Sequence, residues 1–127
     1  MEMVTNALNW FELPVSDFAR AKKFYSTIFD FEMPEMVMGP NLMGFFLYDQ
    51  KQGGTGGAIV RGPGYVPTEN GTLIYFNGGS DLMTVLNRVE KAGGVILLPK
   101  TLITADLGYF AIVRDSEGNK IALHSMH

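Results

Sequence analysis

The hydrophobic pattern changes its period at Ser16-Asp17. Before this point alternate residues are apolar, as in a strand buried on one face: Phe11, Leu13 and Val15. After it, apolar residues recur every three or four positions, as in an amphipathic helix: Phe18, Ala21, Phe24, Tyr25 and Ile28. Ser16 can accept a hydrogen bond from the first helical turn, and Asp17 suits the positive end of the helix dipole. The pattern predicts a strand over about residues 7–14 and a helix over 17–29.

The same change of period occurs again in the second half of the chain. Ser80-Asp81 follows a second strand pattern and opens a second helical one, and positions 16 and 80 differ by 64. Gly44-Phe45-Phe46-Leu47 resembles Gly108-Tyr109-Phe110-Ala111, and positions 44 and 108 also differ by 64. Because this offset is about half of the 127 residues, the pattern indicates an internal duplication.

Three further strands are predicted in each half. They cover about residues 31–38, 42–48 and 56–61 in the first half. In the second half they cover 95–98, where Pro99 ends the strand, then 107–114 and 120–126, after a helix over about 81–92. Residues 100–106 are predicted to form a loop. The glycine- and proline-rich segment 62–70 is predicted to link the halves, and a flap centred on Tyr65 is the alternative.

This organisation predicts an α+β fold in one domain over residues 1–127. The first βαβββ module covers about 1–61, the linker 62–70 and the second module about 71–127. Each helix covers one face of its module and leaves the other face open. We expect a curved, mostly antiparallel eight-stranded sheet, an incomplete barrel, around a shared cleft with the helices on the outside.

Two motifs resemble those of a known family. The segments PVSDFARAKKFY (14–25) and GYFAIVRDSEGNKIAL (108–123) are similar to the "PVsDlerAxxFY" and "DpeGNxIeL" patterns of the vicinal oxygen chelate superfamily. This superfamily comprises glyoxalases, bleomycin resistance proteins and extradiol dioxygenases. The resemblance implies the fold described above and a homodimer. It does not select a chemistry, because the superfamily includes isomerases, dioxygenases, thiol transferases and binding proteins.

The metal ligands that the resemblance implies are missing at the matching positions. Metal-binding members carry His, Gln or Glu there, whereas this chain has Trp10, Thr72 or Leu73, residues 57–59, and Ala122. Tryptophan, alanine and leucine offer no lone pair to a divalent ion. We therefore expect no metal centre and no cofactor. A relocated metal on Glu12 and His124 would need two further ligands that the sequence does not identify.

Strand alternation predicts the side chains that face the cleft: Trp10 and Glu12, Tyr75 and Asn77, and Ala122 and His124. Glu12 and His124 can converge, either as catalytic acid–base groups or as a structural pair. Trp10, Tyr75, Asn77 and Tyr109 are the candidate substrate-binding residues, because aromatic rings with a few polar groups are typical of small-molecule sites. Core packing is the alternative for each of these rings.

Composition narrows the classes of partner. The net charge is −3 and the ten Lys and Arg residues are scattered, so no nucleic-acid surface is expected. The chain lacks cysteine, which excludes thiol catalysis and disulfides. No run is apolar enough to span a membrane and no signal peptide is evident, so we expect a cytoplasmic protein.

Three functional hypotheses follow. The first is a metal-free, glyoxalase- or bleomycin-resistance-like protein that binds a small organic molecule in its cleft. The second is a glyoxalase-type lyase, isomerase or dioxygenase-like enzyme that uses Glu12 and His124. The third is a non-catalytic interaction module whose concave face is filled by a partner or by its own side chains.

Overall fold

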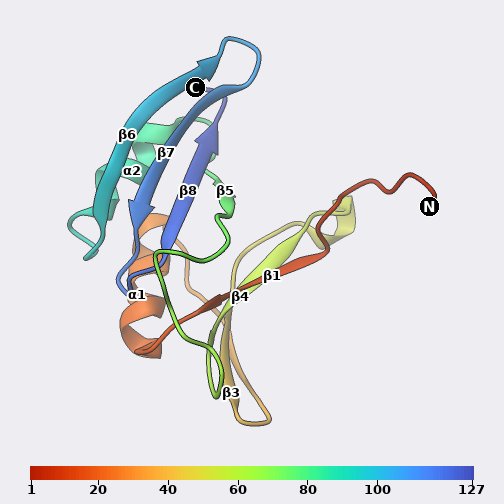
Figure 1. The fold of residues 1–127 in the computed structure, drawn as a ribbon, viewed down its shortest axis with the longest axis vertical. Coiled ribbons are helices and arrows are strands. Elements are labelled where there is room, and N and C mark those ends of the chain that lie inside the picture. The colour runs from red at the N-terminus through yellow and green to blue at the C-terminus, as the bar shows by residue number, and fades with distance from the viewer.

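A computed structural model describes all of residues 1–127. Figure 1 shows its helices and strands in the following order: β1 (Trp10–Pro14), α1 (Phe18–Ile28), β2 (Glu35–Met38), β3 (Asn41–Phe45), the single turn η1 (Gln50–Gln52), β4 (Gly56–Arg61), β5 (Tyr75–Asn77), α2 (Leu82–Val89), β6 (Val95–Thr104), β7 (Gly108–Arg114) and β8 (Lys120–Ser125). Neither helix has the length and apolar character that a membrane crossing requires.

The eight strands form two sheets of four with the same topology. The first sheet has the order β1-β4-β3-β2 and the second β5-β8-β7-β6. In each sheet the first strand pairs in parallel with the last strand of its module, and the other pairs are antiparallel. The predicted α+β class with two βαβββ modules is confirmed. The strands do not close into a barrel, and β1 and β5 are each left at the edge of a sheet.

Both helices begin at an aspartate. Asp17 is the N-cap of α1, and its Oδ1 accepts a hydrogen bond of 3.1 Å from the backbone N–H of Arg20. Asp81 caps α2 in the same way, with a bond of 3.0 Å from the N–H of Met83. The prediction that Ser16 caps the first helix is wrong. The predicted helices themselves are confirmed, each shorter at its ends than the pattern suggested.

One hydrophobic core joins the two modules. Its members come from both helices and from the helix-facing side of both sheets, including Leu13, Tyr25, Leu86, Val113 and Leu123. The strand alternation predicted for β1 is confirmed, since Leu13 and Val15 are buried while Glu12 is exposed. Figure 1 shows the two sheets diverging from the region of α1, with the N-terminal residues projecting beyond the first sheet.

The long strand β6 departs from the sequence prediction. The predicted end at Pro99 and the loop over 100–106 are wrong, because the strand continues to Thr104. Its register with β7 shifts near Pro99, between Leu98 and Thr101. Proline is tolerated here because β6 is an edge strand, where an N–H that faces outward needs no partner in the sheet.

A buried polar network fastens the first module to the turn before β8. The hydroxyl of Tyr25 donates a hydrogen bond of 2.5 Å to Asp115 Oδ2, and both residues are buried. Asn119 Nδ2 donates to the backbone oxygen of Pro14 at 2.7 Å. Burial, together with the Asp115 carboxylate, raises the pKa of Tyr25 well above its usual value.

Glu117 lies in the same turn and binds the start of α1. One carboxylate oxygen accepts hydrogen bonds from the N–H groups of Ser16 and Asp17, at 3.0 and 2.7 Å. The other oxygen pairs with Arg20 Nε at 2.7 Å. Burial acts to raise the pKa of Glu117, but the bonds from Arg20 and the backbone outweigh it and hold that pKa below its ordinary value.

Candidate ligand site at the module seam

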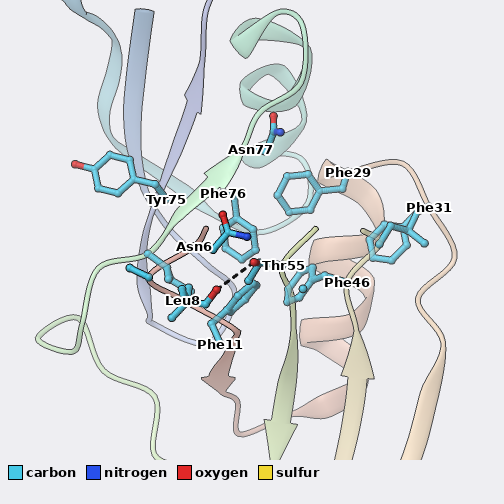
Figure 2. Close-up of a pocket in the computed structure, with 14 residues that line it drawn as sticks. Asn6, Leu8, Phe11, Phe29, Phe31, Phe46, Thr55, Tyr75, Phe76 and Asn77 are labelled. Atoms are coloured by element: carbon cyan, nitrogen blue, oxygen red, sulfur yellow. Dashed lines mark hydrogen bonds between the residues drawn. The ribbon is translucent and has the colours of Figure 1, made fainter. Parts of the chain in front are cut away.

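A pocket of about 500 Å³ lies where the first module meets β5. Figure 2 shows its lining, in which five phenylalanines from four segments of the chain gather around one space: Phe11, Phe29, Phe31, Phe46 and Phe76. We call it the seam pocket. The remaining lining residues are Asn6, Ala7, Leu8, Leu47, Thr55, Gly56, Ile74, Tyr75 and Asn77. Ten of the fourteen lining residues are hydrophobic, so the pocket suits an apolar occupant.

Local backbone features bring the phenylalanines together. Phe29 and Phe31 follow α1 and flank Asp30, whose positive φ of 52° turns the chain at the helix end. Phe11 lies on the edge strand β1 beside Gly57, and a Cβ on Gly57 would clash with the Phe11 ring. The glycine therefore makes room for this wall of the pocket.

The ring of Phe76 is in contact with three of the other rings. Its centroid lies 5.4 Å from that of Phe11, 5.0 Å from that of Phe46 and 5.3 Å from that of Phe29. These separations lie in the range that favours tilted and edge-to-face aromatic pairs. Because β5 supplies Phe76 while the other three rings come from the first module, the pocket exists only when the modules are docked.

The segment 6–8 forms one side of the seam pocket. Thr55 Oγ1 donates a hydrogen bond of 3.1 Å to the carbonyl oxygen of Leu8, drawn as the dashed line in Figure 2. Asn6 Nδ2 donates to the carbonyl oxygen of Gly53 at 3.4 Å. Both bonds connect the segment to the polar glycine-rich stretch before β4. Thr55, Asn6 and Asn77 are the polar groups that can orient a ligand.

Two of the four predicted substrate-binding residues line the seam pocket. Tyr75 lies at the rim, with more than half of its surface exposed, and Asn77 follows it on β5. Asn77 Oδ1 accepts a hydrogen bond of 2.9 Å from the N–H of Gly79, which fixes the direction of its amide. The alternation predicted for β5 thus placed both residues away from the core.

The other two predicted binding residues lie elsewhere. Trp10 is on the opposite face of β1 from Phe11, and its ring lies beside those of Phe45 and Tyr48. Tyr109 packs against the core with Lys100 Nζ 4.6 Å from its ring centre, so its prediction as a cleft residue is wrong. Its neighbour Phe110 lies beside Tyr75 instead, with 6.3 Å between the ring centres. Tyr109 and Phe110 are consecutive residues of β7, so their side chains lie on opposite faces of the sheet.

Glu12 and His124 are not joined in the structure. Glu12 Oε1 accepts a hydrogen bond of 2.7 Å from the hydroxyl of Tyr65. The Nε2 of His124 lies 2.5 Å from the carbonyl oxygen of Leu107 and therefore carries the proton. The two side chains belong to different sheets and form no ion pair with each other. Glu12 and His124 therefore do not share a site in which they could act together as an acid–base pair.

The side chains at the family's metal positions do not fit a divalent ion. Trp10 and Ala122 occupy two of these positions, and neither offers a donor atom. Elsewhere, no three His, Asp or Glu side chains lie close enough to hold a metal ion.

Sequence reasoning did not identify the phenylalanines of the seam pocket. Phe11 was correctly assigned to the buried side of its strand, and Phe76 lies on the corresponding side of β5 between the outward-facing Tyr75 and Asn77, but this side also borders the pocket. The available signal was the number of phenylalanines, nine in 127 residues, several of them at segment ends.

Comparison with known proteins identifies the family of this chain. A family model matches residues 7–123, nearly the whole chain. The chain belongs to the Glyoxalase/Bleomycin resistance protein/Dioxygenase superfamily. The predicted resemblance is therefore confirmed. A search of curated protein sequences finds no significant match.

Solved structures of this superfamily have the same fold. A glyoxylase/bleomycin resistance protein/dioxygenase domain from Frankia sp. EAN1pec is 16% identical with a TM-score of 0.68, over 96% of this chain and 98% of that one. A glyoxalase/bleomycin resistance protein from Albidiferax ferrireducens T118 is 18% identical with a TM-score of 0.67, over 93% and 98%. The E144Q mutant of glyoxalase I from Zea mays is 18% identical with a TM-score of 0.67, over 92% of this chain but 46% of that one. At these identities the likeness shows the fold alone.

Proposed function

We propose that this superfamily member binds a small, ring-containing organic molecule in the seam pocket without using a metal ion. The observation that supports this most directly is the seam pocket itself, with a volume of about 500 Å³ and a lining in which ten of fourteen residues are hydrophobic. Pockets for small ligands are typically of this size and are lined by apolar groups with a few placed polar ones.

The lining favours a flat, largely uncharged ligand. No Lys, Arg, Asp or Glu side chain lines the pocket, so a charged group inside it would lack a counter-charge. The phenylalanine rings offer faces and edges for a second ring. Asn77 and Thr55 can provide hydrogen bonds at the rim, which suits a hydroxyl or carbonyl substituent.

A fluorescent probe tests the proposal. N-phenyl-1-naphthylamine, an uncharged aromatic probe whose emission rises in apolar sites, should bind saturably and with a single stoichiometry. Leu47→Trp should weaken binding at least tenfold, about 1.4 kcal/mol, because residue 47 lines the pocket and is 71% exposed, so the larger ring can fill the space without displacing the core. Leu107→Trp is the matched control, because Leu107 is also exposed and lies outside the pocket. Equal affinity in the two variants would refute the proposal.

We further propose a homodimer. The edge strand β2 exposes three consecutive apolar residues, Met36, Val37 and Met38. An exposed apolar edge of this kind favours association with another chain. Light scattering should report a dimer that Val37→Lys dissociates. Val66→Lys, at an equally exposed site in the linker, should leave it intact. A monomeric native protein would contradict this proposal and leave the ligand proposal standing.

A further inference from the structure

A carboxylate lies within the apolar open face of the first sheet. Glu12 on β1 lies beside Ala58 on β4, and Ala58 lies beside Phe45 on β3. These three side chains share the face of the sheet that is turned away from the seam pocket, since Phe11 lines that pocket from the other face. Met43 and Val60 continue the apolar surface around Ala58. Glu12 is therefore a single charged group among apolar neighbours.

Aromatic rings border this carboxylate. Trp10 is two residues before Glu12 on the same strand and the same face. Its ring centre lies 6.1 Å from that of Phe45 and 6.2 Å from that of Tyr48. Ala58 is completely buried beneath this surface. Its small methyl group lies between the larger side chains of Glu12 and Phe45.

The linker contributes a fourth ring. Tyr65 packs against the cluster of Met43, Ala58 and Val60, and its hydroxyl donates the 2.7 Å hydrogen bond to Glu12 Oε1. Gly64 has a positive φ of 84°, a conformation that glycine adopts without strain, and it turns the chain immediately before Tyr65.

The charge of Glu12 has no counter-charge. The four ion pairs of the protein involve other carboxylates, and the Tyr65 hydroxyl is the one hydrogen-bond partner of the Glu12 side chain. Its second oxygen, Oε2, has no partner in the protein. A carboxylate with aromatic side chains nearby attracts a cation through its own charge, and the electron-rich faces of such rings can add to this attraction.

We propose that this face binds a small organic cation, an amine or quaternary ammonium, with its charge beside Glu12 Oε2 and its carbon groups against Trp10, Phe45 and Tyr65. The site is separate from the seam pocket and goes beyond the function proposed above. An inorganic divalent ion would find only one carboxylate and the Tyr65 hydroxyl here, too few oxygen ligands to hold it, whereas an alkylammonium group needs only the charge and the rings.

The single tryptophan makes the site directly observable. Trp10 is the only tryptophan in the chain, so its fluorescence reports on this face alone. Titration with choline should give a saturable fluorescence change. Dimethylbutanol, in which a carbon atom replaces the charged nitrogen of choline, should bind at least tenfold more weakly. Equal affinity for the two compounds would overturn the proposal, because the face would then be a neutral apolar surface.

Two variants test the role of the carboxylate. Glu12→Gln should lower the affinity for choline at least tenfold, and it should fold normally because Glu12 is exposed. Glu35→Gln is the matched control on the same sheet, because Glu35 is an exposed carboxylate that pairs with Lys22 away from the rings. Unchanged binding by Glu12→Gln would overturn the proposal. A Trp10 fluorescence that changes on protein dilution but not with choline would also overturn the proposal, because it would show that a second copy of the chain covers this face.

Discussion

Tyr25→Phe should destabilise the protein by about 2 kcal/mol. The variant removes one hydroxyl that donates to a buried carboxylate and leaves the ring packing unchanged. Hydrogen bonds to charged groups contribute about 1.5–3 kcal/mol. The lower part of this range applies because Asp115 keeps three other donors, the N–H groups of Glu117 and Asn119 and the amide of Asn119.

Thermal and urea unfolding measure this loss. Proteins unfold with an entropy of about 2.1 cal/mol/K per residue, so for 127 residues a loss of 2 kcal/mol corresponds to a decrease of about 7 °C in Tm. Tyr75→Phe is the control, because Tyr75 is exposed and its hydroxyl makes no hydrogen bond within the protein. A change below about 0.5 kcal/mol in Tyr25→Phe would refute the view that this bond fastens the modules.

The stabilisation that Tyr25→Phe removes should depend on pH. The pKa of Tyr25 is raised in the folded state by burial and by Asp115, so the folded protein keeps this proton when the unfolded chain loses it. The unfolded state then binds fewer protons, and stability falls by up to about 1.4 kcal/mol per pH unit above pH ~10. Tyr25→Phe lacks this contribution. The stability difference between native protein and variant should therefore narrow from pH ~10 upward, and a constant difference would contradict the argument.

Two further predictions concern the turn before β8 and the seam pocket. Because the pKa of Glu117 is lowered in the folded state, its stabilising contribution is present above its unfolded pKa and is lost as the pH falls through the folded value. Urea unfolding of Glu117→Gln should therefore show less acid destabilisation than the native protein, and parallel pH profiles would argue against this role. Gly57→Ala should destabilise by about 1–3 kcal/mol, because the added Cβ meets the Phe11 ring and backbone. Gly71→Ala, whose Cβ would approach only Thr68, should change stability by less than about 0.5 kcal/mol in the same measurement.

The sequence alone determined the elements and the faces of most strands. The change of period at Ser16-Asp17 located α1, and its repeat at Ser80-Asp81 located α2. Alternation assigned Leu13 and Val15 to the core and left Glu12 outside it. These features depend on backbone geometry over a few residues, which is why a local pattern is sufficient to predict them.

Only the tertiary structure decided how the faces combine. Tyr109 was misplaced because its aromatic character did not show which face of the sheet it occupies. The strand β6 was ended too early because the sequence did not show that it lies at a sheet edge, where Pro99 is tolerated. The angle between the two sheets keeps Glu12 apart from His124. The path of the linker places Tyr65 beside Glu12 as its hydrogen-bond partner. The seam pocket likewise depends on Phe76 meeting rings from the other module. Such contacts join residues far apart in the chain, and their positions follow from the packing of whole modules rather than from any local periodicity.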